Sequence, residues 1–150
     1  NLLARCGEGE IMTREARMIS GIILLTVATI QYGGYFPLTS LMNQGSGYTE
    51  NPLRQNFFRA GHAHAGVIVI LSLVGQVLAD GAVLPDPLLW LVRVGVPLAA
   101  ILISSGFFFS VLPPTAAQAS GAVAMIYLGA GVLALSVVTP GVRLSRSRPS

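Results

Sequence analysis

Long apolar segments alternate with short polar ones along the chain, and four of the apolar segments are long enough to cross a bilayer. These predicted spans cover residues 18–36, 57–79, 88–112 and 116–138. A transmembrane helix needs about 20 predominantly apolar residues. Each predicted span ends at or near a proline, a glycine or a charged residue, as expected of helix ends. Because lipid offers the backbone no hydrogen-bond partner, we expect all four spans to be α-helices.

Charged residues are scarce and lie mostly between the predicted spans. They make up 10% of the 150 residues, against roughly a quarter in soluble domains, and the mean hydropathy is +0.69. The nine basic residues, all arginines, are scattered and do not interleave with aromatic side chains, which argues against nucleic-acid binding. The sequence therefore predicts an all-α integral membrane protein, a bundle of four transmembrane helices embedded in the lipid bilayer.

The distribution of arginine predicts the orientation of this bundle. Arg14 and Arg17 precede the first predicted span, and Arg143, Arg146 and Arg148 follow the fourth. Because cytoplasmic loops carry an excess of basic residues, we expect both termini to be cytoplasmic.

The chain divides into three predicted parts. We expect residues 1–11 to be a disordered N-terminal extension, residues 12–140 to form the four-helix membrane domain, and residues 141–150 to form a basic cytoplasmic tail. Such a chain is expected to be a multi-pass protein of the bacterial plasma membrane.

Small residues in the fourth predicted span indicate close helix packing. Gly129, Ala130, Gly131 and Ala134 lie within this span, and helices in lipid approach most closely where small residues meet. We therefore expect one face of this span to touch a neighbouring helix at backbone distance.

Both histidines of the chain lie inside the second predicted span, as His62-Ala63-His64. At 1.5 Å of helix rise per residue they lie about 7 to 10 Å from its start. An ionisable side chain in a membrane helix is costly and is by default a functional candidate. Side chains two residues apart on a helix point roughly 200° away from each other, so the two rings cannot bind one metal ion. Neutral imidazole is the usual haem ligand, and the small neighbours leave space for a flat macrocycle. We therefore take His62 and His64 as candidate ligands of haem b or of a metal, with copper as the other possibility.

Other polar side chains are predicted at the same membrane level. Arg59 suits a haem propionate or a lipid phosphate, because its guanidinium binds either group in bidentate geometry; the alternative is an arginine that snorkels to the interface. The supporting residues come from the first, third and fourth spans: Gln31, Tyr32, Tyr35, Ser104, Ser105 and Gln118. Together with the histidines we expect them to form an outer-leaflet pocket.

The His62-Ala63-His64 motif resembles one in subunit I of the haem–copper oxidase superfamily. In that family, a helix that enters from the outer face carries a His-x-His pair near its outer end, and the two rings ligate two different haems. That subunit is built from three pseudo-symmetric arcs of four helices, with metal-ligating histidines in the second helix of each arc. The chain resembles one such arc, which implies that His62 and His64 are haem ligands.

The chain also departs from that family. It lacks counterparts of the cross-linked His-Tyr copper site, of the remaining histidines and of the acidic proton-channel residues. A complete oxygen-reducing site in one chain is therefore excluded, and whether the chain is an enzyme stays open. Three self-associated copies would bring six histidines around one centre, so we expect a homo-oligomer, such as a trimer, or a larger membrane complex.

Three classes of function stay open at this point. The first is a small membrane haem protein for electron transfer, for gas binding or as an accessory to a respiratory complex. The second is a non-catalytic accessory or structural membrane subunit whose histidines hydrogen-bond to adjacent helices. The third is a small transporter with the histidine pair as a proton relay. No predicted span contains an acidic residue, and this weakens the case for proton-coupled transport. Soluble enzymes are excluded, because no nucleophile elbow, P-loop or dinucleotide fingerprint is present.

Overall fold

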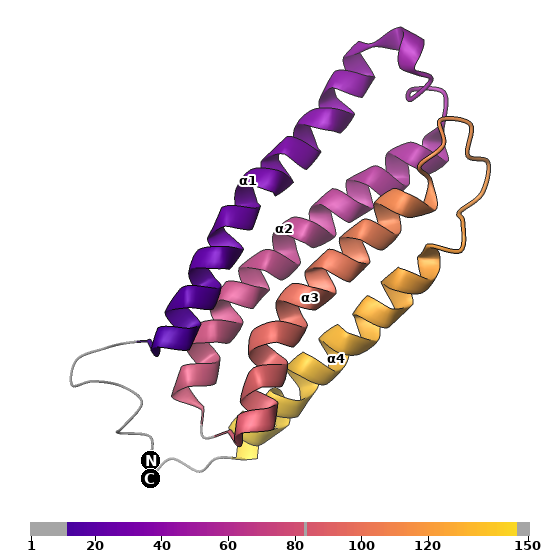
Figure 1. The fold of residues 1–150 in the computed structure, drawn as a ribbon. Helices are drawn as coiled ribbons and strands as arrows, with labels where there is room; N and C mark the ends of the chain where they lie inside the picture. Colours follow the sequence, from indigo (N-terminus) through magenta and orange to yellow (C-terminus); the bar gives the residue numbers. More distant parts are fainter. Residues whose placement is uncertain (1–11, 83, 147–150) are drawn as a thin grey trace.

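A computed structural model describes residues 12–82 and 84–146, and its regular secondary structure within these ranges is entirely helical (Figure 1). The elements are α1 (Arg14–Met42), the 3-10 helix η2 (Gln44–Ser46), α2 (Pro52–Gly81), α3 (Asp86–Ser110) and α4 (Val123–Arg146). All four α-helices are long and apolar enough to cross a membrane. The predicted all-helical class with four candidate spans is thus confirmed. The predicted extension, residues 1–11, and the last four residues of the predicted tail lie outside the described residues.

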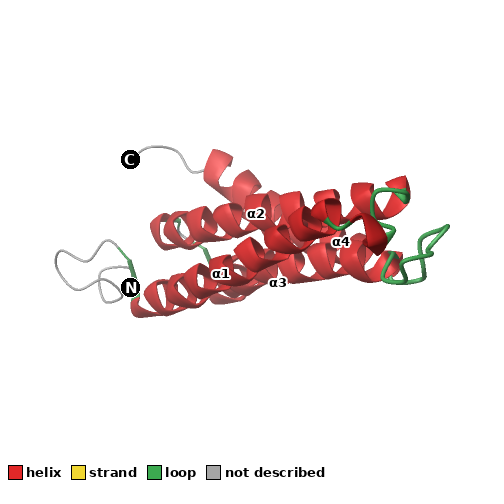
Figure 2. Cartoon of the chain, turned by 90° about the horizontal axis from the view of Figure 1, so that it is seen from above, coloured by secondary structure: helices red, strands yellow, loops and turns green. Residues whose placement is uncertain are grey.

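The four α-helices lie side by side in chain order (Figure 1), and all of them run along a common direction (Figure 2). α1 packs mainly against α2, α2 against α3, and α3 against α4. The start of α1 and the end of α4 lie at the same end of the molecule, which we call the Arg14 end. The opposite end, which we call the Tyr48 end, carries the connections 43–51 and 111–122.

Two prolines that were predicted to end helices lie inside them. α1 continues through Pro37 to Met42, and α4 continues through Pro140 to Arg146, so this prediction was wrong. A proline removes one N–H donor and usually breaks a helix, but hydroxyl side chains can offset that loss in apolar helices. Thr39 Oγ1 donates to the backbone carbonyl of Tyr35 over 3.1 Å, so it adds a bond next to Pro37 but does not replace the donor that the Gly33 carbonyl loses.

The connection between α3 and α4 is longer than predicted. Residues 116–122, which were expected to begin the fourth helix, form turns instead. Their backbone groups bond to neighbouring elements: Ser120 N donates to Ser110 O over 2.8 Å, and Asn51 Nδ2 donates to Ala116 O over 3.0 Å. These bonds tie the segment to the ends of α2 and α3 and leave α4 to begin at Val123.

Glycines set the close contact between α3 and α4. A Cβ atom added to Gly106 would lie 2.7 Å from Ile126 Cγ1, and one added to Gly129 would lie 2.7 Å from Ile103 Cγ1. Close packing of the fourth helix is therefore confirmed at Gly129. It does not extend to Gly131, where a Cβ would meet no atom within 4 Å.

The main apolar core lies between α1, α2 and α3. Its buried members are Ile23 from α1, Ile68 and Val69 from α2, and Val96, Ala100 and Ile103 from α3. α3 is the most buried of the four helices, because it packs against α2 on one side and α4 on the other. This core supports the segments that carry the histidines and a separate buried cluster of charges.

Candidate functional site

The histidines lie deeper along their helix than the sequence suggested. α2 begins at Pro52. Asn51 is its N-cap, and the side-chain oxygen of Asn51 accepts a hydrogen bond from Arg54 N over 3.1 Å. His62 is therefore ten residues into the helix, or about 15 Å from its start. Asn51-Pro52 is a recognisable sequence signal, because asparagine favours the cap position and proline the first helical position.

The two imidazole rings point to opposite sides of α2, as their spacing predicts. His62 faces α1, where a Cβ atom added to Gly34 would lie 2.8 Å from His62 Cε1. His64 packs beside Phe107 of α3, with ring centroids 5.1 Å apart. The two rings are thus available to different ligands or neighbours.

One ring nitrogen of His64 is hydrogen-bonded, and the other makes no hydrogen bond with a described residue. Its Nδ1 atom lies 2.8 Å from the backbone carbonyl oxygen of Ala60. Because a carbonyl can only accept a hydrogen bond, Nδ1 carries the proton in this contact. The neutral ring therefore has an unprotonated Nε2, on a side chain that is exposed at the helix surface.

His62 borders a cavity of about 340 Å³ between α1, α2 and α3. It makes no hydrogen bond with another described residue. Ser104 and Ser105 of α3 line the same cavity, so the structure brings these two predicted supporting residues together with His62.

The other four predicted supporting residues do not line this cavity. Gln31, Tyr32 and Tyr35 lie on the exposed surface of α1, and Gln118 is exposed in the turns between α3 and α4. The cavity at His62 therefore contains fewer of the predicted polar residues than expected, because Gln31, Tyr32 and Tyr35 lie on the exposed surface of α1.

Arg59 lies toward the Tyr48 end, where it is exposed and its Nη2 atom donates to Gln55 Oε1 over 3.4 Å. Its charge acts on Tyr48. Burial raises the pKa of Tyr48, and the positive charges of Arg59 and Arg54 lower it in part.

Arg54 is a buried residue that the sequence reasoning missed. Its guanidinium lies 5.0 Å above the ring of Phe58. Arg54 Nε donates to Val111 O over 3.1 Å, and Nη2 donates to Leu112 O over 3.2 Å. These bonds satisfy carbonyls that the end of α3 leaves free. Arg54 therefore joins the start of α2 to the end of α3.

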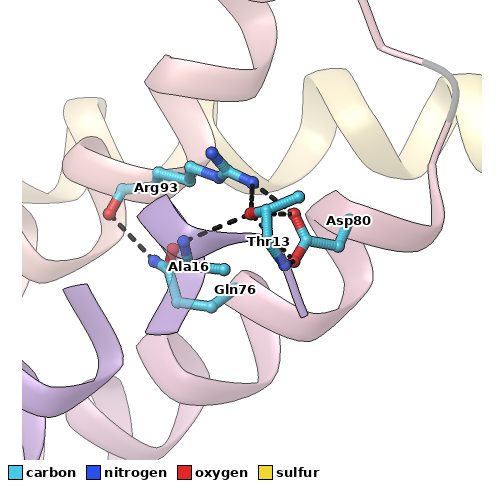
Figure 3. Close-up of polar contacts among 5 residues, drawn as sticks. All are labelled: Thr13, Ala16, Gln76, Asp80 and Arg93. Carbon is cyan, nitrogen blue, oxygen red and sulfur yellow. Dashed lines mark hydrogen bonds and ion pairs between the residues drawn. The ribbon is translucent and has the colours of Figure 1, made fainter. Parts of the chain in front are cut away.

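A second missed group is a buried ion pair at the Arg14 end (Figure 3). Arg93 of α3 pairs with Asp80 of α2, and their side chains are only 3% and 4% exposed. Thr13, which caps α1, joins both: Arg93 Nη2 donates to Thr13 Oγ1 over 2.8 Å, and Thr13 N donates to Asp80 Oδ2 over 2.8 Å. With Gln76 these residues form what we call the Arg93 cluster, which holds three helices together.

Gln76 takes the place of a missing backbone donor. Pro97 lies inside α3 and has no N–H, so the carbonyl four residues earlier, that of Arg93, loses its helical partner. Gln76 Nε2 donates to this Arg93 oxygen over 3.0 Å and is fully buried. The proline in α3 is thus compensated by a side chain from α2.

The cluster corrects one argument from the sequence. The second predicted span ends at residue 79, which leaves Asp80 outside it. In the structure α2 extends to Gly81 and includes Asp80, whose side chain is buried. The sequence did contain a signal for this ion pair. Asp80 and Arg93 carry opposite charges near the adjoining ends of two apolar segments, and a short connection between these segments brings the two residues close together.

The described residues contain no group of three or more histidine, cysteine, aspartate or glutamate side chains placed to hold one metal ion. Each histidine could serve as a single axial ligand. Comparison of the chain with known protein families, with curated proteins and with solved structures found no match. The functional argument therefore rests on the geometry of the histidines and their surroundings.

Proposed function

We propose that the chain is a small integral membrane protein that binds haem b through its His62-Ala63-His64 segment, with His64 as the axial ligand. The observation that carries the proposal is the contact of His64 Nδ1 with Ala60 O. Metal-ligating histidines commonly donate their other ring N–H to a backbone carbonyl, which fixes the ring and leaves Nε2 to bind.

The surroundings of His64 fit an axial ligand better than a closed metal site. Haem iron needs only one or two protein ligands, whereas structural zinc usually takes four. Phe107 packs beside the ring, and the neighbouring Val67 presents an exposed apolar surface. When bound, haem would supply a one-electron redox centre or a site for a gas molecule.

The exposure of His64 implies a second covering surface. A haem on this side of α2 would stay open unless another protein covered its far face, because His64 lies on the surface of the described chain. We propose a second copy of the chain as that cover, in a homo-oligomer. Two copies would then offer one His64 to each face of the haem.

His62 has a different role in this proposal. Its ring touches the backbone of α1 at Gly34, where a side chain would collide. This contact favours a role for His62 in packing α1 against α2 rather than in binding haem. It also supports the second candidate function, an accessory membrane subunit whose histidines only hold helices together.

A visible spectrum of the full chain, expressed with added haem precursor and purified in detergent, tests the proposal. We expect a Soret band that His64→Ala reduces at least tenfold and that His62→Ala leaves largely intact. His64→Met, which keeps an axial ligand, is the matched control and should retain part of the band. Absence of a Soret band in the wild-type protein would leave the accessory subunit as the better account.

Carbon monoxide binding to the reduced protein separates the possible uses of the haem. If two His64 residues occupy both axial positions, carbon monoxide binds weakly and electron transfer is the function. If one position is open, carbon monoxide binds tightly and gas binding is the function. Native mass spectrometry of the same sample counts chains per haem, with two chains expected for the first case.

We further propose that the Arg14 end faces the cytoplasm of a bacterial cell. Arg14, Arg17, Arg143 and Arg146 gather at this end, and basic residues favour the cytoplasmic side. A fluorescent protein fused to the C-terminus should be fluorescent, whereas a periplasmic phosphatase fused there should be inactive. The reverse pattern would contradict the orientation.

A further inference from the structure

The cavity beside His62 is almost entirely apolar and lies between three helices. Its wall includes Ile22 of α1 and Ile101 of α3, which are 57% and 61% exposed. In a bilayer, these side chains would contact lipid. A ligand for this cavity would therefore enter from the membrane, and the apolar wall selects against a charged headgroup.

Three polar side chains on this wall, those of His62, Ser104 and Ser105, make no hydrogen bond with another described residue. Ser104 is only 8% exposed, and its hydroxyl oxygen is buried without a hydrogen bond. The imidazole of His62 also lacks one. Two other hydroxyls on the same wall are satisfied: Thr26 donates to Ile23 O over 2.6 Å, and Ser72 donates to Ile68 O over 2.7 Å. Of the three unbonded side chains, Ser104 has the buried hydroxyl, whereas Ser105 and His62 are half-buried.

A backbone group also lies at the edge of the cavity. Gly33 lines it, and the residue four positions later is Pro37, which has no N–H to donate to the Gly33 carbonyl. In α3 the comparable carbonyl is paired by Gln76. The wall therefore combines hydrogen-bond donors and an acceptor with an otherwise apolar surface.

We propose that this cavity binds the ring of a membrane-soluble quinone, whose oxygen atoms form hydrogen bonds with Ser104 and His62 while its apolar tail passes between α1 and α3 into the lipid. An acyl chain has no atom that would satisfy these two groups. A cavity of about 340 Å³ is at the lower end of the range for small-ligand pockets, which suits a single substituted ring. The site lies on the opposite side of α2 from His64, so it is independent of haem binding.

Titration of the full chain in lipid nanodiscs with decylubiquinone tests this proposal, with empty nanodiscs as the blank. We expect saturable binding of one quinone per chain. Ser104→Ala and His62→Leu should each weaken binding about five- to tenfold, because each removes one hydrogen bond. Ser72→Ala is the matched control, since its hydroxyl lines the same cavity but is already bonded within α2, and it should leave binding unchanged.

A matched ligand separates the quinone from other apolar molecules. Decylbenzene carries the same tail without ring oxygens and should not compete with decylubiquinone. Equal binding of both compounds, or no effect of Ser104→Ala, would overturn the proposal. If His62→Leu does not fold, Ser104→Ala decides alone, since it only removes an unpaired hydroxyl.

The two proposals can fail separately. His64→Ala should remove haem and leave quinone binding intact. Quinone binding that disappears in His64→Ala but persists in Ser104→Ala would place the quinone elsewhere and overturn this assignment. Absence of a haem band in the wild-type protein, with retained quinone binding, would contradict only the proposed function.

Discussion

The Arg93 cluster and the His62 cavity both contain buried polar atoms without a hydrogen bond to a described residue, Arg93 Nε and Gln76 Oε1 in the cluster and Ser104 Oγ in the cavity wall, but only the cluster has its charges paired. In the Arg93 cluster, the ion pair of Arg93 and Asp80 is closed by Thr13, and Gln76 supplies the donor that Pro97 lacks. In the His62 cavity, the imidazole and the Ser104 hydroxyl border an apolar space without a partner.

This difference separates structure from binding. A buried charge that is paired fixes helices relative to each other, and removal of one member leaves its partner without a counter-charge in an apolar environment. An unpartnered polar group inside a protein is costly, and Ser104 and His62 border an apolar cavity in which a ligand can complete their hydrogen bonds. We therefore assign the Arg93 cluster to stability and the His62 cavity to ligand binding.

The largest expected effect comes from Arg93→Met. The substitution leaves the Asp80 carboxylate buried at 4% exposure without its cation, so we expect a loss of about 3–5 kcal/mol in the free energy of unfolding. Unfolding in detergent, followed by circular dichroism, measures this loss. The double variant Arg93→Met, Asp80→Leu should recover most of it, because no charge is left unpaired. A single variant as stable as the wild type would refute the structural role of the cluster.

The effects of substituting Gln76 and Pro97 on the free energy of unfolding should depend on each other. Gln76→Leu removes the donor to Arg93 O and should cost about 1–3 kcal/mol. With Pro97→Ala, the backbone regains an N–H for this carbonyl, so the same Gln76→Leu change should then cost less than about 1 kcal/mol. A double-mutant cycle from unfolding curves measures the difference. Equal costs in both backgrounds would show that Gln76 does not replace the missing donor.

Adjacent glycines in α1 probe the contact with His62. Gly34→Ala places a Cβ 2.8 Å from His62 Cε1, and we expect it to destabilise the protein by about 1–3 kcal/mol. Gly33→Ala meets no atom within 4 Å and should stabilise it by up to about 1 kcal/mol, because alanine is the better helix former. Thermal unfolding of both variants makes the comparison. Similar behaviour of the two would contradict the close approach of α1 to His62.

The smallest expected effect concerns Tyr48, whose hydroxyl is buried without a partner. Tyr48→Phe should be neutral or stabilising by up to about 1 kcal/mol. Because burial raises the pKa of Tyr48 in the folded state, the neutral ring favours folding below about pH 10, and this contribution is lost as the pH rises further. Thermal unfolding between pH 8 and 11 should show a decline in the wild type that is weaker in the variant. Equal slopes would indicate that Tyr48 does not cause the decline.

The helices were predictable because their signals are local. An apolar segment of sufficient length must become a helix in lipid. The starts of α1 and α2 were predicted at residues 18 and 57 and lie earlier, where Thr13 and Asn51 cap the helices through their own side chains. The helix ends at Pro37 and Pro140 were missed, because α1 and α4 continue through these prolines, each of which removes only one N–H donor from its helix.

The candidate site was predictable only in part. The opposite directions of His62 and His64 follow from helix geometry, so the sequence determined them. The exclusion of Gln31 and Tyr35 from the cavity, and the inclusion of Ser104, depend on how α1 and α3 are rotated against α2. That rotation is set by packing of side chains that are distant in the sequence.

The sequence by itself thus determined four apolar helices and a pair of histidines on opposite sides of one of them, because length, composition and helical repeat act over a few residues. Only the tertiary structure decided which polar groups meet. Thr13 is 67 residues from Asp80 and 80 residues from Arg93, and the choice between a partnered cluster and an open cavity depends on contacts that only helix packing can create.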